Sequence, residues 1–165
     1  MNTEKILKDK AILVVDDEPD VLDSITDLLD MCRIYRAKDH EIALQLMAEF
    51  KIDIVILDVM GVRGFELLKK SVSKGFPTVM LTAHAVTTEA LKESIRLGAV
   101  SFVPKEKMAE LDVYLAEVVT GNKEMVWKNL LDKLGDLFDR RFGSDWKEKD
   151  EFFRKFEEEL SAAKK

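Results

Sequence analysis

The sequence contains one cysteine, Cys32, among its 165 residues. A single thiol cannot form an internal disulfide, so a disulfide-stabilised secreted scaffold is excluded. Long apolar runs are also missing: the first ten residues lack the apolar core of a signal peptide, and the longest aliphatic runs, AILVV and IVIL, have only the length of a strand. We therefore expect neither a secretory signal nor membrane insertion, and we expect a cytoplasmic location.

Positive charge is in deficit. The chain has 26 lysine and arginine residues against 32 aspartate and glutamate residues, which gives a net charge of −6 and a pI near 5.1. This balance argues against broad, nonspecific binding to nucleic acid. Hydrophobic residues make up 47% of the sequence, which is enough to bury a core and too much for a disordered chain.

The composition changes near residue 120. All of the net negative charge lies in residues 1–120, whereas the positive and negative charges of residues 121–165 balance. More than half of the aromatic residues fall in this last segment. Gly121 and Asn122 lie at the junction and are typical of a turn after a helix. We therefore expect one domain over residues 9–120 and a helical extension over residues 121–165.

Strand and helix patterns alternate along residues 9–120. Short apolar runs typical of buried strands occupy residues 11–15, 34–37, 52–57, 77–82 and 101–103. A segment with helical spacing follows each of them. Strands that alternate with helices imply right-handed crossovers between parallel strands. The pattern predicts an α/β fold, with a doubly wound five-stranded parallel sheet between layers of helices.

Five polar residues lie at or just after the carboxyl ends of these strands: Asp16, Asp17, Asp58, Thr82 and Lys105. Sites form at this edge of an open α/β sheet. Three convergent carboxylates repel one another without a cation, and hard oxygen ligands suit Mg²⁺ or Mn²⁺. One aspartate would be free to attack phosphorus, with the hydroxyl and the ammonium on the remaining phosphoryl oxygens. The set predicts a transient aspartyl phosphate.

These residues resemble the receiver domain of two-component response regulators, the CheY-like family. The motifs that carry the resemblance, in chain order, are Asp16 and Asp17 after AILVV, Asp58 after IVIL, then Leu81, Thr82, Ala83, Gly98, Ala99, Phe102 and Lys105. The resemblance covers residues 9–120 and implies a flavodoxin-like (βα)5 fold. It also implies a phosphoacceptor signalling protein rather than an enzyme, with a sensor histidine kinase or a phosphotransfer protein as its partner.

The resemblance implies a role for each residue of the site. Asp58 would accept the phosphoryl group, and Lys105 would contact its oxygens. Asp17 would bind Mg²⁺ directly and Asp16 through water, while Asp58 and the main-chain carbonyl of Met60 would complete the metal site.

Two residues would form the switch that the family uses. Thr82 would reorient on phosphorylation, and Phe102 would be the rotating aromatic on the output face of the domain. The resemblance therefore implies that phosphorylation changes which protein surface is presented to a partner.

Two departures from the family pattern leave an alternative open. Segment 58–64 is shorter than is usual in the family and lacks its proline, and Pro104 precedes Lys105 where a proline usually follows the lysine. The competing hypothesis is a receiver-fold scaffold that works in protein interaction without phosphorylation.

Residues 121–165 have an apolar pattern of their own. Helical spacing runs over residues 126–142, and a second apolar face follows a break at Gly143. This predicts an α-helical hairpin, or one long helix with a break. Two helices alone cannot bury so many aromatic side chains, so they must pack against residues 9–120, a second copy or another protein. We favour an interaction or homodimerisation element, with docking onto the same chain as the alternative.

The composition of this segment argues against other outputs. It is short for a helix-turn-helix domain, it carries no net charge, and its basic cluster consists of Arg140 and Arg141 alone, all of which disfavours DNA binding. It contains no histidine, no cysteine and no glycine-rich loop, which disfavours an enzymatic output.

Overall fold

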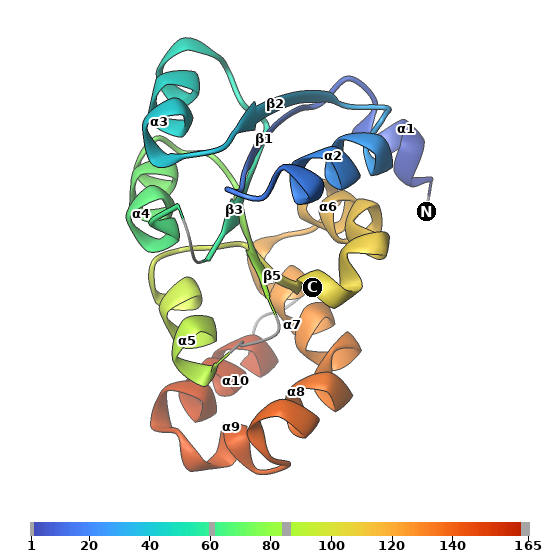
Figure 1. Ribbon diagram of the computed structural model, residues 1–165. Helices are drawn as coiled ribbons and strands as arrows, with labels where there is room; N and C mark the ends of the chain where they lie inside the picture. Colours follow the sequence, from blue (N-terminus) through green and yellow to red (C-terminus); the bar gives the residue numbers. More distant parts are fainter. Residues whose placement is uncertain (1, 60–61, 84–86, 163–165) are drawn as a thin grey trace.

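The computed structural model describes residues 2–59, 62–83 and 87–162 (Figure 1). Its strands form one parallel sheet with the order β2-β1-β3-β4-β5. The strands are β1 (Ala11–Val15), β2 (Arg33–Ala37), β3 (Ile54–Asp58), β4 (Thr78–Thr82) and β5 (Ser101–Pro104). This is the flavodoxin-like order of a doubly wound sheet, so the predicted fold class is confirmed.

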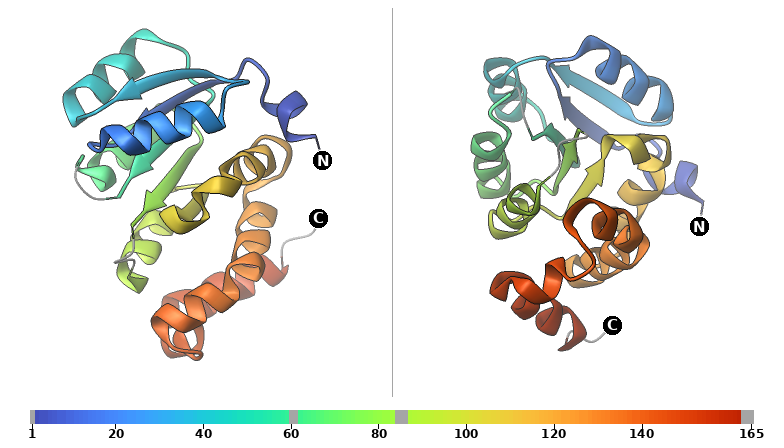
Figure 2. Two further views of the ribbon diagram at one scale, coloured as in Figure 1. Left: turned by 45° about the vertical axis from the view of Figure 1, so that its right-hand side comes forward. Right: turned by 60° about the horizontal axis from the view of Figure 1, so that its bottom comes forward.

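Helices cover both faces of the sheet (Figure 2). The helices of the described residues are α1 (Thr3–Leu7), α2 (Pro19–Leu28), α3 (His40–Glu49), α4 (Gly64–Ser73), α5 (Thr88–Arg96), α6 (Leu111–Thr120), α7 (Lys123–Lys133), α8 (Gly135–Phe142), α9 (Trp146–Lys149) and α10 (Glu151–Ala162). One face carries α2 and α6, and the other carries α3, α4 and α5. Within the described residues, no helix has both the length and the apolar character to cross a membrane.

The burial of the strands explains their sequences. β1, β3 and β4 are buried along their whole length because helices lie on both faces, and their sequences are accordingly almost continuous apolar runs. The two edge strands differ from each other. β2 is partly exposed, whereas β5 is fully buried although, among the described residues, it pairs with one neighbour only. Something other than a sixth strand therefore covers the β5 edge.

Two helices begin at a side chain that caps their first turn. The side chain of Asp39 accepts a hydrogen bond from the Ile42 N–H at 2.9 Å and begins α3. Thr87 does the same for α5, where its Oγ1 accepts from the Ala90 N–H at 3.0 Å. Such caps satisfy N–H groups that the first turn of a helix leaves unpaired. They fix where each helix starts after the strand that precedes it.

Two local elements differ from the sequence expectation. The chain after β5 first forms a 3-10 turn, η1 (Lys105–Glu110), and only then the α-helix α6. The short helix α1 was not expected; it packs against α6, buries Leu7 completely, and its Thr3 Oγ1 donates to Asp112 Oδ2 at 3.1 Å.

The described part of residues 121–165 is the predicted helical hairpin. Its first arm is α7 and α8, its second arm is α9 and α10, and the chain reverses at Gly143, which has a positive φ of 94°. Only glycine adopts that conformation without strain. The second arm breaks at Asp150, whose side chain accepts the Phe152 N–H at 2.8 Å and so begins α10.

The hairpin packs on its own chain, and it covers the buried edge strand. Trp127 of α7 is almost fully buried, and its indole Nε1–H donates to the Ala99 carbonyl just before β5, at 3.1 Å. The ring centroids of Phe138 in α8 and Phe102 in β5 lie 6.4 Å apart. Docking onto the same chain, the alternative left open by the sequence, is the arrangement in this structure.

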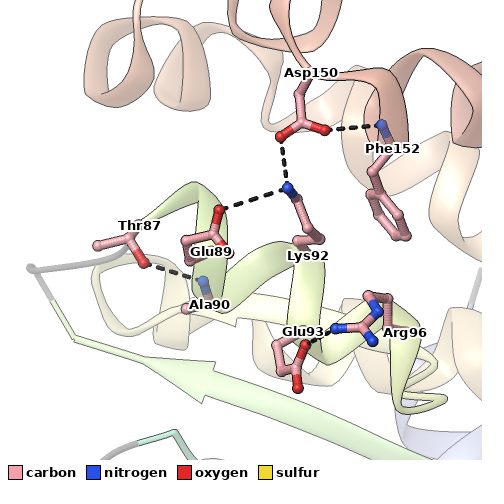
Figure 3. A network of polar contacts seen from close by, with 8 residues as sticks. All are labelled: Thr87, Glu89, Ala90, Lys92, Glu93, Arg96, Asp150 and Phe152. Carbon is pink, nitrogen blue, oxygen red and sulfur yellow. Dashed lines mark hydrogen bonds and ion pairs between the residues drawn. The ribbon is translucent and has the colours of Figure 1, made fainter.

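A second contact joins the hairpin to α5 (Figure 3). Lys92 of α5 reaches across to Asp150, with its Nζ 2.7 Å from Asp150 Oδ2, and it lies 5.9 Å from the centre of the Phe152 ring. Glu89 lies on the other side of the same ammonium group at 3.5 Å. The hairpin therefore contacts the domain both at β5 and at α5.

Candidate acidic site at the carboxyl edge of the sheet

The strand order reverses between β1 and β3, and in open α/β sheets the crevice at the carboxyl edge lies beside such a reversal. Asp16 directly follows β1, Asp58 ends β3, Thr82 ends β4 and Lys105 directly follows β5. Four polar residues that lie far apart in the sequence are thereby brought to one edge, because parallel strands all end on the same side.

Three aspartates form an acidic cluster in the crevice. One carboxylate oxygen of each of Asp16, Asp17 and Asp58 lies within 4.8 Å of the other two. Asp16 is completely buried, Asp58 is nearly so, and Asp17 is exposed. The cluster therefore has a buried floor of two carboxylates and one side open to solvent.

Asp16 is fixed by its neighbours. Its Oδ1 accepts the Glu18 N–H at 2.9 Å, which is the turn that leads into α2. Burial raises the pKa of the Asp16 carboxyl above its ordinary value, and the Glu18 N–H and the nearby Lys105 ammonium offset only part of this effect. A buried carboxylate with a raised pKa is one that a cation at this position would stabilise.

Lys105 supplies a positive charge at the same place. Its Nζ lies 2.9 Å from Glu18 Oε1, 3.1 Å from Asp16 Oδ2 and 3.6 Å from Asp58 Oδ1. Burial is the largest single influence on the pKa of the ammonium and lowers it, but the contacts to Glu18 and Asp16 together with the charge of Asp58 outweigh burial and raise the pKa. Lys105 is therefore protonated at neutral pH.

The donor set fits a magnesium ion. In an octahedral Mg²⁺ site with bonds of about 2.1 Å, ligand oxygens lie about 3.0 to 4.2 Å apart. One oxygen of each of Asp16, Asp17 and Asp58 lies within 4.8 Å of the other two, which is close to this range. Carboxylate oxygens on the open side of a crevice also leave room for water ligands, which Mg²⁺ retains in most proteins.

A glycine lets the chain fold closely around this site. A Cβ atom on Gly64, at the start of α4, would lie 2.3 Å from the carbonyl oxygen of Asp58 and 2.7 Å from that of Val59. Only a residue without a side chain fits there. The short connection 58–64 is therefore compatible with a helix that begins directly against the end of β3. Met60, whose carbonyl the family resemblance assigns to the metal, lies outside the described residues.

Thr82 and Phe102 occupy different surroundings. Thr82 is buried at the end of β4, between the strand that carries Asp58 and the strand that precedes Lys105. Phe102 is completely buried in β5 and lies next to Phe138 of the hairpin. The structure thus brings Thr82 to the edge where the acidic cluster lies, and it places Phe102 between the sheet and the hairpin.

An ion pair at the residue after Lys105 links the acidic site to the hairpin. Glu106 directly follows Lys105 in η1, and its Oε1 lies 2.6 Å from Nη2 of Arg141 in α8. One short segment, β5 and η1, therefore contacts the acidic cluster through Lys105 and the hairpin through Phe102 and Glu106.

Comparison with known proteins identifies the family. Residues 12–116, well over half of the chain, match the response regulator receiver domain. The chain belongs to this family. Two curated relatives are each 30% identical to the receiver: response regulator GtcR of Aneurinibacillus migulanus, over 101 residues, and a probable cyclic di-GMP phosphodiesterase of Vibrio cholerae, over 102 residues. Each match covers 58% of this chain, but only 41% and 23% of the relatives' own lengths.

Solved structures show the same fold. The receiver domain of NtrX from Brucella abortus is 31% identical, with a TM-score of 0.58, and the match covers 66% of this chain and 96% of that one. A CheY-like receiver domain protein from Methanospirillum hungatei has a TM-score of 0.54 at 21% identity, and the match covers 81% of this chain and 99% of that one. The receiver fold assigned from the motifs is therefore confirmed.

The sequence did not indicate one member of the site. Glu18 contributes the oxygen closest to the Lys105 ammonium, and it lies two residues after Asp16 at the start of α2. A glutamate before a proline that opens a helix is typical of an ordinary helix start. Its position next to the aspartate pair was the one sign in the sequence that Glu18 belongs to the site.

Proposed function

We propose that this receiver accepts a phosphoryl group on Asp58 from the phosphohistidine of a sensor kinase or of a phosphotransfer protein in the cytoplasm. The observation that carries the proposal is the convergence of one ammonium, Lys105, with the carboxylates of Asp16 and Asp58 in the crevice at the switch of strand order. The protein would act as a signalling phosphoprotein, with no chemistry beyond its own phosphorylation and dephosphorylation.

The chemistry follows from the side chains. A carboxylate oxygen of Asp58 forms a bond to phosphorus, the phosphorus–nitrogen bond of the donor breaks, and its electron pair remains on the imidazole nitrogen. Lys105 lies 3.6 Å from Asp58 Oδ1 and donates to the phosphoryl oxygens, and the Thr82 hydroxyl lies on the neighbouring strand. When Mg²⁺ is bound by Asp16, Asp17 and Asp58, it neutralises negative charge on the phosphoryl group.

The output that we propose is a change in how the C-terminal hairpin packs. Phosphorylation draws Lys105 towards Asp58, and Glu106 is the next residue in the same turn. Because Glu106 pairs with Arg141 and Phe102 packs on Phe138, movement of this segment alters two contacts of the hairpin. A changed hairpin would expose or hide a surface for a protein partner or for a second copy.

One experiment tests both parts. The protein is incubated with acetyl phosphate and Mg²⁺, uptake of one phosphoryl group is followed by intact mass, and tryptophan fluorescence is recorded at the same time. Both tryptophans of the chain, Trp127 and Trp146, lie in the hairpin, so fluorescence reports on its packing. We expect uptake together with a fluorescence change, and loss of both in Asp58→Asn.

Matched arginine variants separate the output from the chemistry. Arg141→Gln removes the partner of Glu106, whereas Arg140→Gln removes the same charge from its exposed neighbour on α8. We expect both variants to take up phosphate, with a weaker fluorescence response in Arg141→Gln alone. Wild-type protein that takes up no phosphate would favour the phosphorylation-independent scaffold that the shortened segment 58–64 suggests.

A further inference from the structure

We propose that Glu18 is a positioning residue that competes with the phosphoryl group for Lys105 and thereby weakens the phosphorylated state. This inference rests on the proposed function, since it concerns the same site. It assigns to Glu18 the role of holding the ammonium away from Asp58 while the site is unphosphorylated.

The distances give the ammonium two close partners and one distant one. Lys105 Nζ donates a hydrogen bond to Glu18 Oε1 at 2.9 Å and forms an ion pair with Asp16 Oδ2 at 3.1 Å, whereas Asp58 Oδ1 at 3.6 Å is beyond hydrogen-bonding distance. The closest carboxylate is thus neither of the buried aspartates but the glutamate, whose side chain is 62% exposed.

The backbone fixes Glu18 in this position. Its N–H donates to Asp16 Oδ1 at 2.9 Å, and its carbonyl accepts from the N–H groups of Val21 and Leu22 in the first turn of α2. Pro19 follows it and restricts the backbone where the helix begins. The side chain of Glu18 therefore leaves a fixed backbone directly beside the acidic cluster.

Phosphorylation of Asp58 changes what Lys105 can bind. A phosphoryl group offers several anionic oxygens at the side where the ammonium is now 3.6 Å from the nearest carboxylate oxygen. Lys105 can move to them only by giving up Glu18, which then becomes solvated because it is exposed. The free energy of the Glu18–Lys105 pair is therefore lost whenever the phosphoryl group is bound by Lys105.

The expected size of the effect follows from the exposure of Glu18. Partly exposed ion pairs change equilibria by a factor of about two to five. Replacement of Glu18 by glutamine, which keeps the shape and removes the charge, should strengthen binding of a phosphoryl mimic by about that factor. An effect on binding that acts through Lys105 must then be distinguished from the effect of removing one negative charge near the site.

A double-mutant cycle makes this separation. Binding of beryllofluoride, the phosphoryl mimic, is measured by ¹⁹F NMR at saturating Mg²⁺ for wild type, Glu18→Gln, Lys105→Met and the double variant. Asp20→Asn is the matched control, because Asp20 is an exposed acid two residues further along, in the first turn of α2. Circular dichroism of each variant checks that it is folded.

We expect Glu18→Gln to bind beryllofluoride about two to five times more tightly than wild type, and Asp20→Asn to bind as wild type does. In the Lys105→Met background, Glu18→Gln should have no effect. An equal gain in both backgrounds would overturn the proposal, since the effect would then be charge alone, and so would unchanged binding by Glu18→Gln. Wild-type protein that binds no beryllofluoride would overturn the proposed function, and this inference with it.

Discussion

At the carboxyl edge of the sheet, five charged side chains lie together, whereas the C-terminal hairpin is built around aromatic rings. All seven aromatic residues of the hairpin belong to one continuous series of ring contacts, with centroids 4.9 to 6.2 Å apart. In the first region three carboxylates lie close together, and burial raises the pKa of the Asp16 carboxyl. The second region buries aromatic side chains, among them Trp127, Phe138, Trp146 and Phe153.

This difference indicates where the molecule can change its structure at a low cost in free energy. A cluster of carboxylates is stabilised by any cation that enters it, so its energy depends on what is bound. Packed aromatic rings gain from burial in every state, so their energy depends on whether they stay together. The β5–η1 segment touches both regions, and it is the place where a change of charge in one can become a change of packing in the other.

The largest effect is expected from the removal of one aromatic ring of the hairpin. Phe138 is completely buried and contacts Phe102, Phe142 and Trp146. We expect Phe138→Ala to lower the free energy of unfolding by about 3–5 kcal/mol, because it removes the ring and leaves a cavity. Urea unfolding followed by tryptophan fluorescence measures the effect on the hairpin.

The same variant tests whether the site depends on the hairpin. We expect Mg²⁺ binding at the acidic cluster, measured by calorimetry, to remain close to that of the wild type. Phe50→Ala is the control, since Phe50 is 42% exposed and its loss should cost little. Loss of Mg²⁺ binding in Phe138→Ala would show that the acidic cluster depends on the packing of the hairpin.

Removal of the Asp16 carboxylate should raise the free energy of unfolding, by less than the loss of the Phe138 ring lowers it. Without metal, Asp16→Asn relieves repulsion within the cluster while keeping an oxygen for the Glu18 N–H, so we expect the free energy of unfolding to rise by about 0.5–2 kcal/mol. Added Mg²⁺ should stabilise the wild type and should stabilise the variant much less. Urea unfolding in EDTA and in Mg²⁺ measures both effects.

Asp53→Asn provides the matched control for this prediction. The Oδ2 of Asp53 accepts the Ala11 N–H at 2.8 Å, away from the cluster, so its replacement should bring no gain. A decrease in stability of Asp16→Asn in EDTA would mean that the ion pair to Lys105 outweighs the repulsion.

The smallest effect is expected at the contact between hairpin and α5. Lys92 lowers the pKa of Asp150 below its ordinary value of 3.8, and Asp150 in turn raises the pKa of Lys92. The pair therefore contributes its full stability above pH 3.8 and loses it as the pH falls through the lowered pKa of Asp150. The raised pKa of Lys92 keeps the pair charged at neutral pH.

Asp150→Asn should accordingly lower the urea midpoint slightly at pH 7, and the difference from wild type should vanish when Asp150 is protonated in both states. The amide oxygen of asparagine can still accept the Phe152 N–H, so the start of α10 is kept. Asp136→Asn, an exposed acid of α8, is the control. A difference that persists unchanged at low pH would contradict the role of the charge.

The sheet and the position of the site were open to prediction from the sequence. Each buried strand is an apolar run that ends in a polar residue or directly precedes one, and parallel strands end on one side, so Asp58 and Lys105 had to meet. The roles of these residues and the division of the chain at residue 120 stay predictions.

Other features depend on tertiary contacts that a linear pattern does not contain. The stripe of Trp127 and Phe138 showed that these rings are buried, but not whether the receiver, a second copy or another protein buries them. The choice of Glu18 as the closest partner of Lys105 depends on where η1 starts after Pro104. Helix α1 has five residues, too few to show a helical period.

The burial of β5 also bears on how the sheet meets other polypeptides. A free edge strand invites another chain to add a strand, and successive additions at two edges lead to open-ended polymers. Here α7 covers the β5 edge, and the opposite edge strand, β2, carries the exposed charges of Arg33 and Arg36. The hairpin therefore also prevents another chain from adding a strand at β5. Its release would leave this edge open to strand addition.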